Sequence, residues 1–377
     1  MTRTVEILDR LVGFASISAE SNLPLIEYVE TILHASGFTL HRIENGAGNK
    51  AGLFASLGAG EGGVLFSGHT DVVPVRGQAW SSDPFRLREE AGRLYGRGTA
   101  DMKTYLASLL AAAEGAAKLP LRQPVKLALS YDEEIGCLGI AEMLPQLQTS
   151  IGLPHLCWVG EPTSMRIAVG HKGKLGLRAL CRGEAGHSAF APQLQNALHP
   201  AVELVMELRR IQEELARHGA RDNAYAVPYS TLHVGKLSGG VALNVVPDAA
   251  EVEFELRYLA QDDAGAIRDS IDAAVQQISA RCATASIELQ QLCTYPGLNT
   301  DPSSAAFRFA RSLLPDAETI KVDFGSEAGY FAGLGIPTLV CGPGSMQQGH
   351  KADEFVTRDQ LSACDSMFAA ALQKLCE

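Results

Sequence analysis

The stretch "FSGHTDVVPV", residues 66–75, ends an apolar run with a histidine and, two residues later, an aspartate. The run 63–66 is short and apolar, which predicts a buried strand. His69 and Asp71 would then lie on the same face at the carboxyl end of that strand, because strand residues alternate between faces. Open α/β sheets bind their ligands at this end. A carboxylate beside a histidine orients imidazoles that bind metals, but such pairs also close loops as plain hydrogen bonds.

Segments with helical and strand periodicity alternate around this stretch, as in an α/β sheet that is at least partly parallel. In the first part of the chain the expected helices are 2–14, 23–36, 102–117 and 138–147, and the expected strands are 39–42, 52–57, 63–66, 125–134 and 155–162. Near the carboxyl end the expected helices are 303–313, 327–332 and one from 358, and the expected strands are 319–322 and 338–340.

A different pattern separates these two parts. It consists of strand 174–182, helix 196–218, strands 230–237 and 251–259, helix 264–281 and strand 285–291. This β-α-β-β-α-β order is that of the ferredoxin-like fold, which is complete by itself. We therefore expect residues 173–292 to form a second domain, inserted into a first domain made of residues 1–172 and 293–377.

The composition is that of a globular protein with two cores: 377 residues, 46% hydrophobic and 20% charged. A net charge of −11 argues against nucleic acid or an anionic membrane as a partner. The first residues, "MTRTVEILDRLVGF", combine a helical period with acids, so they are not expected to be a signal peptide, and no apolar run has transmembrane length. Eight scattered cysteines without a CxxC pair favour reduced thiols in a cytoplasmic protein.

Two short motifs imitate sites of other enzyme classes. "GAGEGG", residues 58–63, resembles a dinucleotide-binding loop, but a strand is expected after it, where that motif requires a helix. "GHSAF", residues 186–190, lacks the second glycine of a lipase-type nucleophile motif. The sequence therefore argues against a nicotinamide-dependent dehydrogenase and against a serine hydrolase of the lipase type.

Acidic residues and histidines follow the expected strands at several points. The residues placed in this way are His69, Asp101, Glu133, Glu134, Glu161 and His350. Because they would meet at one edge of the sheet with no basic residue among them, their carboxylates would resist ionising together. Two divalent cations remove this conflict, and a set of imidazoles and carboxylates suits zinc, with manganese or cobalt as substitutes. A strand-terminal acid taken singly is more often a solvated loop residue; the whole set favours a metal site.

The motifs "GHTDVVP", "YGRGTADMK", "YDEE", "GEPTS" and "GHKADEF", in this order and with an inserted domain, resemble the M20 family of dinuclear zinc amidohydrolases. The resemblance implies a zinc-peptidase-like α/β/α sandwich as the catalytic domain. It also implies an inserted ferredoxin-like domain that forms a homodimer, and two zinc ions per subunit. It covers nearly the whole chain.

Carried over motif by motif, the resemblance assigns roles to these residues. The metal ligands would be His69, Asp101, Glu134, Glu161 and His350, with Asp101 bridging the two ions. Glu133 would be the general acid/base, or alternatively a solvated neighbour of the site. Asp71 would orient His69.

In the inserted domain the resemblance points to residues that bind the substrate. Asn244 and Arg257 would hold its carboxylate, for which the planar guanidinium of arginine is suited. His187 would reach the scissile carbonyl from the partner subunit of the dimer. The alternatives are a charge on the strand surface for Arg257 and a surface histidine for His187.

Within the family the closer resemblance, through "GEPTSMR", "AVPYSTLHVG" and "LVCGPGSMQQGHKADEF", is to deacetylases of Nα-acetyl amino acids. It implies hydrolysis of an Nα-acyl amino acid, with N-acetyl-L-ornithine, a precursor in arginine biosynthesis, as the leading substrate. Alternatives are N-acetylcitrulline, N-succinyl-diaminopimelate, other acyl amino acids and dipeptides, or a catalytically dead metal-binding protein. Val245 and Thr104 stand where such deacetylases carry arginine and glycine, and "FGSEAGYF" matches them loosely, so the substrate side chain is left open.

Overall fold

The computed structural model describes residues 2–58, 61–281 and 286–377. It divides into two compact units: Met1–Gly170, Leu298–Lys321 and Ser326–Glu377 form the first, and His171–Gly297 and Val322–Gly325 the second. The expected inserted residues 173–292 fall within the second unit. Ala59 and Gly60 of "GAGEGG" and the first residue of the expected strand 285–291 lie outside the described residues.

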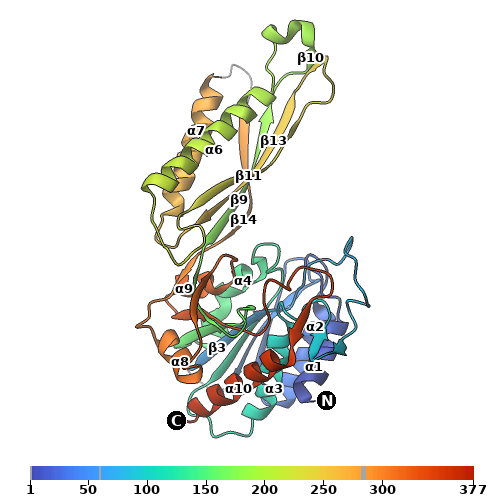
Figure 1. Ribbon diagram of the computed structural model, residues 1–377, viewed down its shortest axis with the longest axis vertical. Helices are drawn as coiled ribbons and strands as arrows, with labels where there is room; N and C mark the ends of the chain where they lie inside the picture. Colours follow the sequence, from blue (N-terminus) through green and yellow to red (C-terminus); the bar gives the residue numbers. More distant parts are fainter. Residues whose placement is uncertain (1, 59–60, 282–285) are drawn as a thin grey trace. The chain divides into compact units, whose positions relative to one another are not determined.

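A mixed sheet runs through the first unit (Figure 1). Its strands are β1 (Thr39–Glu44), β2 (Ala51–Leu57), β3 (Val64–His69), β6 (Val125–Ser130), β7 (Leu156–Val159), β8 (Ile167–His171), β15 (Leu298–Asn299), β16 (Thr319–Val322) and β17 (Thr338–Val340). The strand order is β1-β2-β6-β3-β7-β17-β8-β15, with β16 beside β8. The central strands β6, β3, β7 and β17 are parallel, whereas β1, β2 and β8 pair antiparallel. The expected α/β fold with a partly parallel sheet is confirmed.

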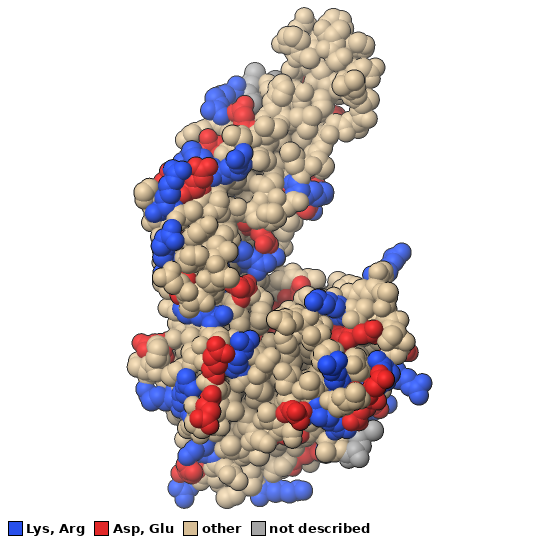
Figure 2. Space-filling view, in the orientation of Figure 1, with Lys and Arg blue, Asp and Glu red and all other residues tan. Residues whose placement is uncertain are grey.

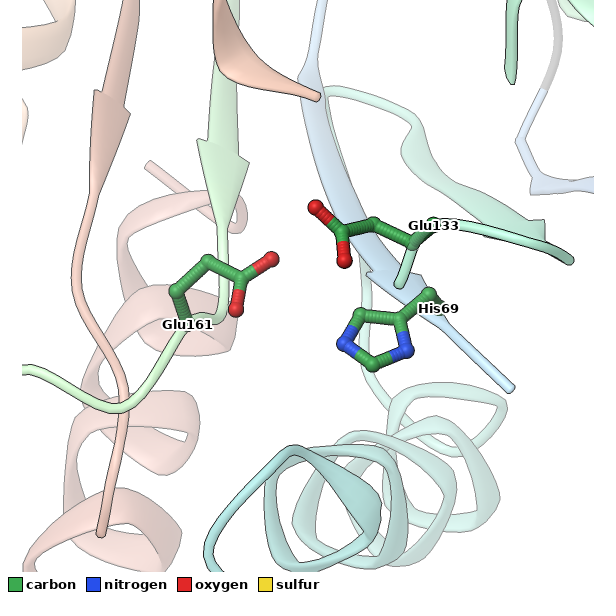
Figure 3. A group of neighbouring side chains, drawn as sticks. All are labelled: His69, Glu133 and Glu161. Carbon is green, nitrogen blue, oxygen red and sulfur yellow. The ribbon is translucent and has the colours of Figure 1, made fainter. Parts of the chain in front are cut away.

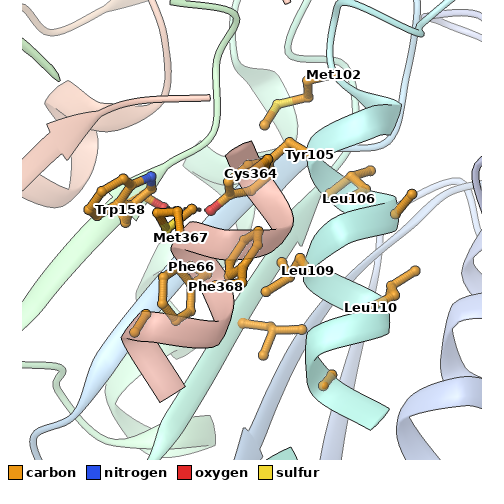
Figure 4. Close-up of a cluster of buried hydrophobic side chains, with 14 of the residues drawn as sticks. Phe66, Met102, Tyr105, Leu106, Leu109, Leu110, Trp158, Cys364, Met367 and Phe368 are labelled. Atoms are coloured by element: carbon orange, nitrogen blue, oxygen red, sulfur yellow. Dashed lines mark hydrogen bonds between the residues drawn. The ribbon is translucent and has the colours of Figure 1, made fainter. Parts of the chain in front are cut away.

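All residues of β3 and β6 are buried, which means that both faces of the sheet are covered, and helices provide this cover. One face shares a core with α1 (Arg3–Gly13), α2 (Leu23–Ala35), α3 (Lys103–Ala116), α8 (Ala305–Leu313) and α10 (Arg358–Lys374). In Figure 4 the rings of Phe66 and Phe368 lie at the centre of this core, with centroids 5.1 Å apart. The helices α4 (Leu138–Met143), α5 (Leu147–Ile151) and α9 (Ala328–Gly333) also contact the strands.

Some elements differ from those expected, for local reasons. Strand β6 ends at Ser130, so that Glu133 and Glu134 lie in the turn that follows it. The expected helix 138–147 is interrupted by a 3-10 turn, Leu144–Gln146, which contains Pro145, a residue without an N–H donor. The strand β3 that follows "GAGEGG" is present, which agrees with the exclusion of a dinucleotide-binding loop. The sequence did not predict β8, β15 or the small sheet of β4 (Arg88–Glu90), β5 (Arg93–Tyr95) and β18 (Phe355–Thr357).

The second unit contains β9 (Gly173–Arg182), α6 (Leu198–His218), β11 (Thr231–Gly239), β13 (Ala249–Tyr258), α7 (Ala264–Arg281) and β14 (Ser286–Tyr295). Its sheet is antiparallel with the order β11-β13-β9-β14, and α6 and α7 lie side by side over it (Figure 1). Along β13, buried apolar residues alternate with charged ones, as on a sheet with one covered face. The expected β-α-β-β-α-β order is present, with an additional two-stranded sheet of β10 (Gly186–His187) and β12 (Val245–Val246).

None of the helices in the described part of the chain has both the length and the apolar character needed to cross a membrane.

Candidate functional site

The strand β3 ends at His69, whose side chain is buried. His69 Nδ1 lies 2.9 Å from the main-chain oxygen of Asp71 and 3.4 Å from its carboxylate Oδ1. The expected pair is therefore present. Strand alternation does not explain why His69 and Asp71 are adjacent, because β3 ends at His69. The loop that follows the strand brings Asp71 to the imidazole instead. With Nδ1 held in this way, Nε2 is the ring nitrogen that faces the other residues of the site.

The carboxylate of Asp71 has a second set of partners that the sequence did not predict. It accepts hydrogen bonds from the main-chain N–H groups of Glu133 at 3.1 Å and Glu134 at 3.3 Å. It also accepts one from the hydroxyl of Ser18 at 2.7 Å. Asp71 thus fixes the turn that carries both glutamates relative to the loop that carries His69.

Asp101 lies between the two histidines. Its Oδ1 is 3.2 Å from Nε2 of His69 and its Oδ2 is 3.3 Å from Nε2 of His350. The same nitrogen of His350 is 2.9 Å from Oε2 of Glu134. The side chains of Asp101 and Glu134 are each 5% exposed and that of His350 is 44% exposed, so the site opens towards solvent at His350.

Glu133 and Glu161 complete the cluster. Figure 3 shows their carboxylates and the imidazole of His69 directed towards a common space. Ligand atoms of these three residues lie within 4.8 Å of one another, and the same holds for His69, Asp101 and Glu134. The structure therefore brings together all the residues of the first unit that the sequence singled out, and Glu133 as well as Glu161 has a ligand atom within 4.8 Å of a ring nitrogen of His69.

The electrostatics of this cluster show the conflict expected among converging carboxylates. Burial raises the pKa of Glu134 to about 7, and the nearby charge of Asp101 acts in the same direction. Burial raises the pKa values of Glu133 and Glu161 well above the usual range, with a further contribution from neighbouring carboxylates. Hydrogen bonds to Asp101 and Glu134 raise the pKa of His350 to about 10. The residues alone therefore retain protons that a divalent cation would displace.

A metal pair fits this donor set. Among the described residues, Oε1 of Glu134 and Oε1 of Glu161 are buried without a hydrogen-bond partner, and buried polar atoms rarely remain unpaired. Two imidazoles with several carboxylates suit zinc better than calcium or magnesium, which prefer oxygen ligands.

Glu327 is a carboxylate of this region that the sequence did not assign to the site. It is 1% exposed and precedes α9, and its Oε2 lies 3.4 Å from the hydroxyl of Ser67 on β3. Burial raises its pKa to about 7. Glu327 could have been found from the sequence in the same way as the other acids, because it follows a strand, β16, by a few residues.

In the second unit, His187 and Asn244 are brought together by the pairing of β10 with β12. The N–H of Ser188 donates to the main-chain oxygen of Asn244 at 3.0 Å. Nδ1 of His187 accepts the N–H of Ala189 at 3.1 Å, so in the neutral ring Nε2 carries the proton and is a donor. Both residues are exposed.

Arg257 lies near the end of β13, one of the two inner strands of the second unit's sheet. Its Nε is 3.0 Å from Oε1 of Glu255 and its Nη1 is 2.7 Å from the hydroxyl of Tyr295. The ion pair agrees with the alternative of a strand-surface charge. The tyrosine fixes the orientation of the guanidinium plane, which also suits a residue that binds a carboxylate.

Solved structures that resemble this fold include an M20 family metallo-carboxypeptidase from Sulfolobus solfataricus, with a TM-score of 0.80, 19% identity and 100% of each chain covered. A tripeptidase from Staphylococcus aureus has a TM-score of 0.77 and 19% identity, and the comparison covers 99% of this chain and 98% of that chain.

Curated relatives named acetylornithine deacetylase come from Pasteurella multocida and Shigella sonnei. Each is 32% identical to this chain; the first match covers 95% of this chain and 92% of the relative, and the second 93% and 92%. Residues 65–374 match the family described as peptidase family M20/M25/M40. The chain therefore belongs to the M20 family of metal-dependent hydrolases.

Proposed function

We propose that this hydrolase is a di-zinc deacetylase that converts N-acetyl-L-ornithine and water into L-ornithine and acetate, a reaction of arginine biosynthesis. The observation that carries the proposal is the position of Asp101, with one carboxylate oxygen facing each histidine. The name shared by relatives 32% identical over most of the chain supports the choice of substrate.

In this proposal His69 and Glu161 would hold one ion, His350 and Glu134 would hold the other, and Asp101 would be a ligand of both. When bound, the metal pair would supply Lewis-acid polarisation of the acyl carbonyl and a water molecule that loses its proton near neutral pH.

Glu133 takes the proton of the attacking water and returns it to the departing amine. Burial raises the pKa of Glu133, which favours a carboxyl group that keeps a proton once it has accepted one and can then donate it. The hydrogen bond from its main-chain N–H to Asp71 fixes its position beside the ligands without using its carboxylate.

A homodimer that forms through the second unit is also part of the proposal. Segments 186–197 and 237–247 contain no Asp, Glu, Lys or Arg, and Figure 2 shows no charged side chain on this end of the unit in the view drawn. Val241 is 88% exposed and Leu243 is fully exposed. Apolar side chains gathered in this way favour contact with another protein surface. In the dimer, His187 would serve the active site of the partner subunit, and Asn244 and Arg257 would hold the substrate carboxylate.

We further propose a reducing, cytoplasmic compartment, which the free thiols of Cys137, Cys157 and Cys341 support.

Replacing Arg257 with alanine is expected to raise KM for N-acetyl-L-ornithine strongly, with a much smaller effect on the same compound whose carboxylate is converted to an amide. The reason is that a charge-assisted pair is lost only in the first case. Steady-state kinetics with both compounds measure the difference. An equal rise in KM for both compounds would mean that Arg257 does not bind the carboxylate and has only a structural role, through its contacts with Glu255 and Tyr295.

The substrate is tested by assaying the zinc-loaded protein against N-acetyl, N-succinyl and N-formyl amino acids and against dipeptides. The proposal predicts the highest kcat/KM for N-acetyl-L-ornithine. A clear preference for N-acetylcitrulline, for an N-succinyl compound or for a dipeptide would replace it by that activity within the family. Metal-loaded protein that hydrolyses no compound of the panel would indicate a binding protein on a hydrolase fold.

A further inference from the structure

Glu354 is a buried carboxylate of the first unit to which neither the metal site nor the chemistry assigns a role. Its side chain is 1% exposed. Its Oε1 accepts two main-chain hydrogen bonds, from the N–H of Ala100 at 2.8 Å and from the N–H of Asp101 at 3.0 Å. The carboxylate therefore holds the backbone of the residue whose side chain faces both histidines.

The other oxygen of Glu354 holds the beginning of the same loop. Oε2 accepts the N–H of Gly98 at 3.1 Å and pairs with Nη1 of Arg97 at 2.5 Å. Gly98 has a φ of +85°, and a Cβ atom added there would lie 2.8 Å from Cγ1 of Val72, so only glycine fits. One carboxylate thus accounts for the course of the loop that ends at Asp101.

A second set of contacts continues from Arg97 to the other histidine. Nη2 of Arg97 donates to Oε1 of Gln78 at 2.6 Å, and Nε2 of Gln78 donates to the main-chain oxygen of His350 at 2.8 Å. His350 has a φ of +62°, in the left-handed region that residues other than glycine rarely adopt. The contact from Gln78 fixes the carbonyl of a residue in this unusual conformation.

We propose that Glu354 is a positioning residue that, through Arg97 and Gln78, sets the distance between Asp101 and His350 and thereby the affinity of the site for its metal pair. This inference rests on the proposed function only in that these two residues bind metal. Partners of metal ligands typically contribute 10–100-fold to metal affinity or activity, so the effect is measurable without an assay of hydrolysis.

The test is a titration of metal-free protein with Zn²⁺ in competition with a chromophoric chelator, together with the unfolding temperature of the metal-free protein. In Glu354→Gln an NH₂ group replaces one of the two acceptor oxygens of the carboxylate. The two N–H donors that bonded to that oxygen then face another donor. Its zinc affinity is expected to fall by about 10–100-fold. Gln78→Ala and Gln78→Glu are expected to lower zinc affinity by a smaller factor at an unchanged unfolding temperature. The glutamate still accepts from Arg97 but has no N–H to donate to His350.

Two variants of the second unit are the controls. Asp262→Asn changes a carboxylate that accepts the N–H of Ala220 at 3.1 Å, and Gln212→Ala removes a glutamine that accepts the N–H of Leu232 at 2.5 Å. Both are expected to keep the zinc affinity of the wild type.

Wild-type zinc affinity in folded Glu354→Gln, or in both Gln78 variants where Glu354→Gln does not fold, would overturn the inference and leave the proposed function intact. Wild-type protein that binds no zinc would refute the proposed function, and the inference with it.

Discussion

The Glu133→Gln protein is expected to retain both metals and to lose at least about 10²–10⁴-fold of the wild-type kcat, the usual contribution of a general acid or base. Glutamine keeps the shape of the side chain but cannot accept the proton of the attacking water. The turn should remain in place, because Asp71 holds it through main-chain N–H groups that the substitution does not change. Elemental analysis and steady-state kinetics on the same preparation measure both quantities.

Glu134→Gln is the matched comparison, since it makes the same chemical change one residue later. Oε2 of Glu134 is 2.9 Å from Nε2 of His350, and its Oε1 is buried without a partner among the described residues. This variant is therefore expected to lose metal, and activity as a consequence. Glu133 also lies close to His69 and Glu161, so it too could be a metal ligand. Metal loss in Glu133→Gln with metal retained in Glu134→Gln would make Glu133 the ligand and Glu134 the general acid/base.

His187→Ala is expected to lose about 10²–10³-fold in kcat, the usual effect of removing one donor to a developing oxyanion, with its metals intact. His187 belongs to the second unit, whereas every proposed metal ligand belongs to the first. Its exposed ring presents Nε2 as a donor, because Nδ1 is occupied by the N–H of Ala189. If each subunit lends this donor to its partner, the defect of one subunit can be repaired by the other.

Mixed dimers test this exchange. His187→Ala and Glu133→Gln proteins, each nearly inactive alone, are unfolded and refolded together in equal amounts. Random pairing makes half of the dimers mixed, and a two-fold axis gives each mixed dimer one site with both groups intact. Activity should return to about a quarter of that of the wild type. If confirmed mixed dimers show no recovery, His187 does not act in the partner's site.

The convergence of the site could be predicted from the sequence because it follows from topology. The carboxyl ends of the parallel strands β3, β6 and β7 lie at one edge of the sheet. The residues that follow these strands therefore meet at this edge, even when the predicted end of a strand is wrong by a few residues. This is why Glu133 and Glu134 reach the site although β6 ends earlier than expected, at Ser130.

Contacts that depend on loop conformation could not be predicted in the same way. The carboxylate of Asp71 reaches main-chain groups 62 residues away, and Oε1 of Glu354 reaches Asp101 across 253 residues. No local period encodes such a contact, because the acceptor is a side chain and the donor is a main-chain group that every residue except proline carries. The sequence also did not predict the strands β10 and β12, because each is two residues long and alternation cannot be detected over two positions.

The most direct test of the account is a titration of metal-free protein with zinc while acetate release from N-acetyl-L-ornithine is measured. We expect no activity in metal-free protein and full activity once two zinc ions per subunit are bound, with no further gain when more zinc is added. Glu133→Gln taken through the same titration should bind the same amount of zinc and release almost no acetate. Full activity in protein shown by elemental analysis to contain no metal would contradict the account.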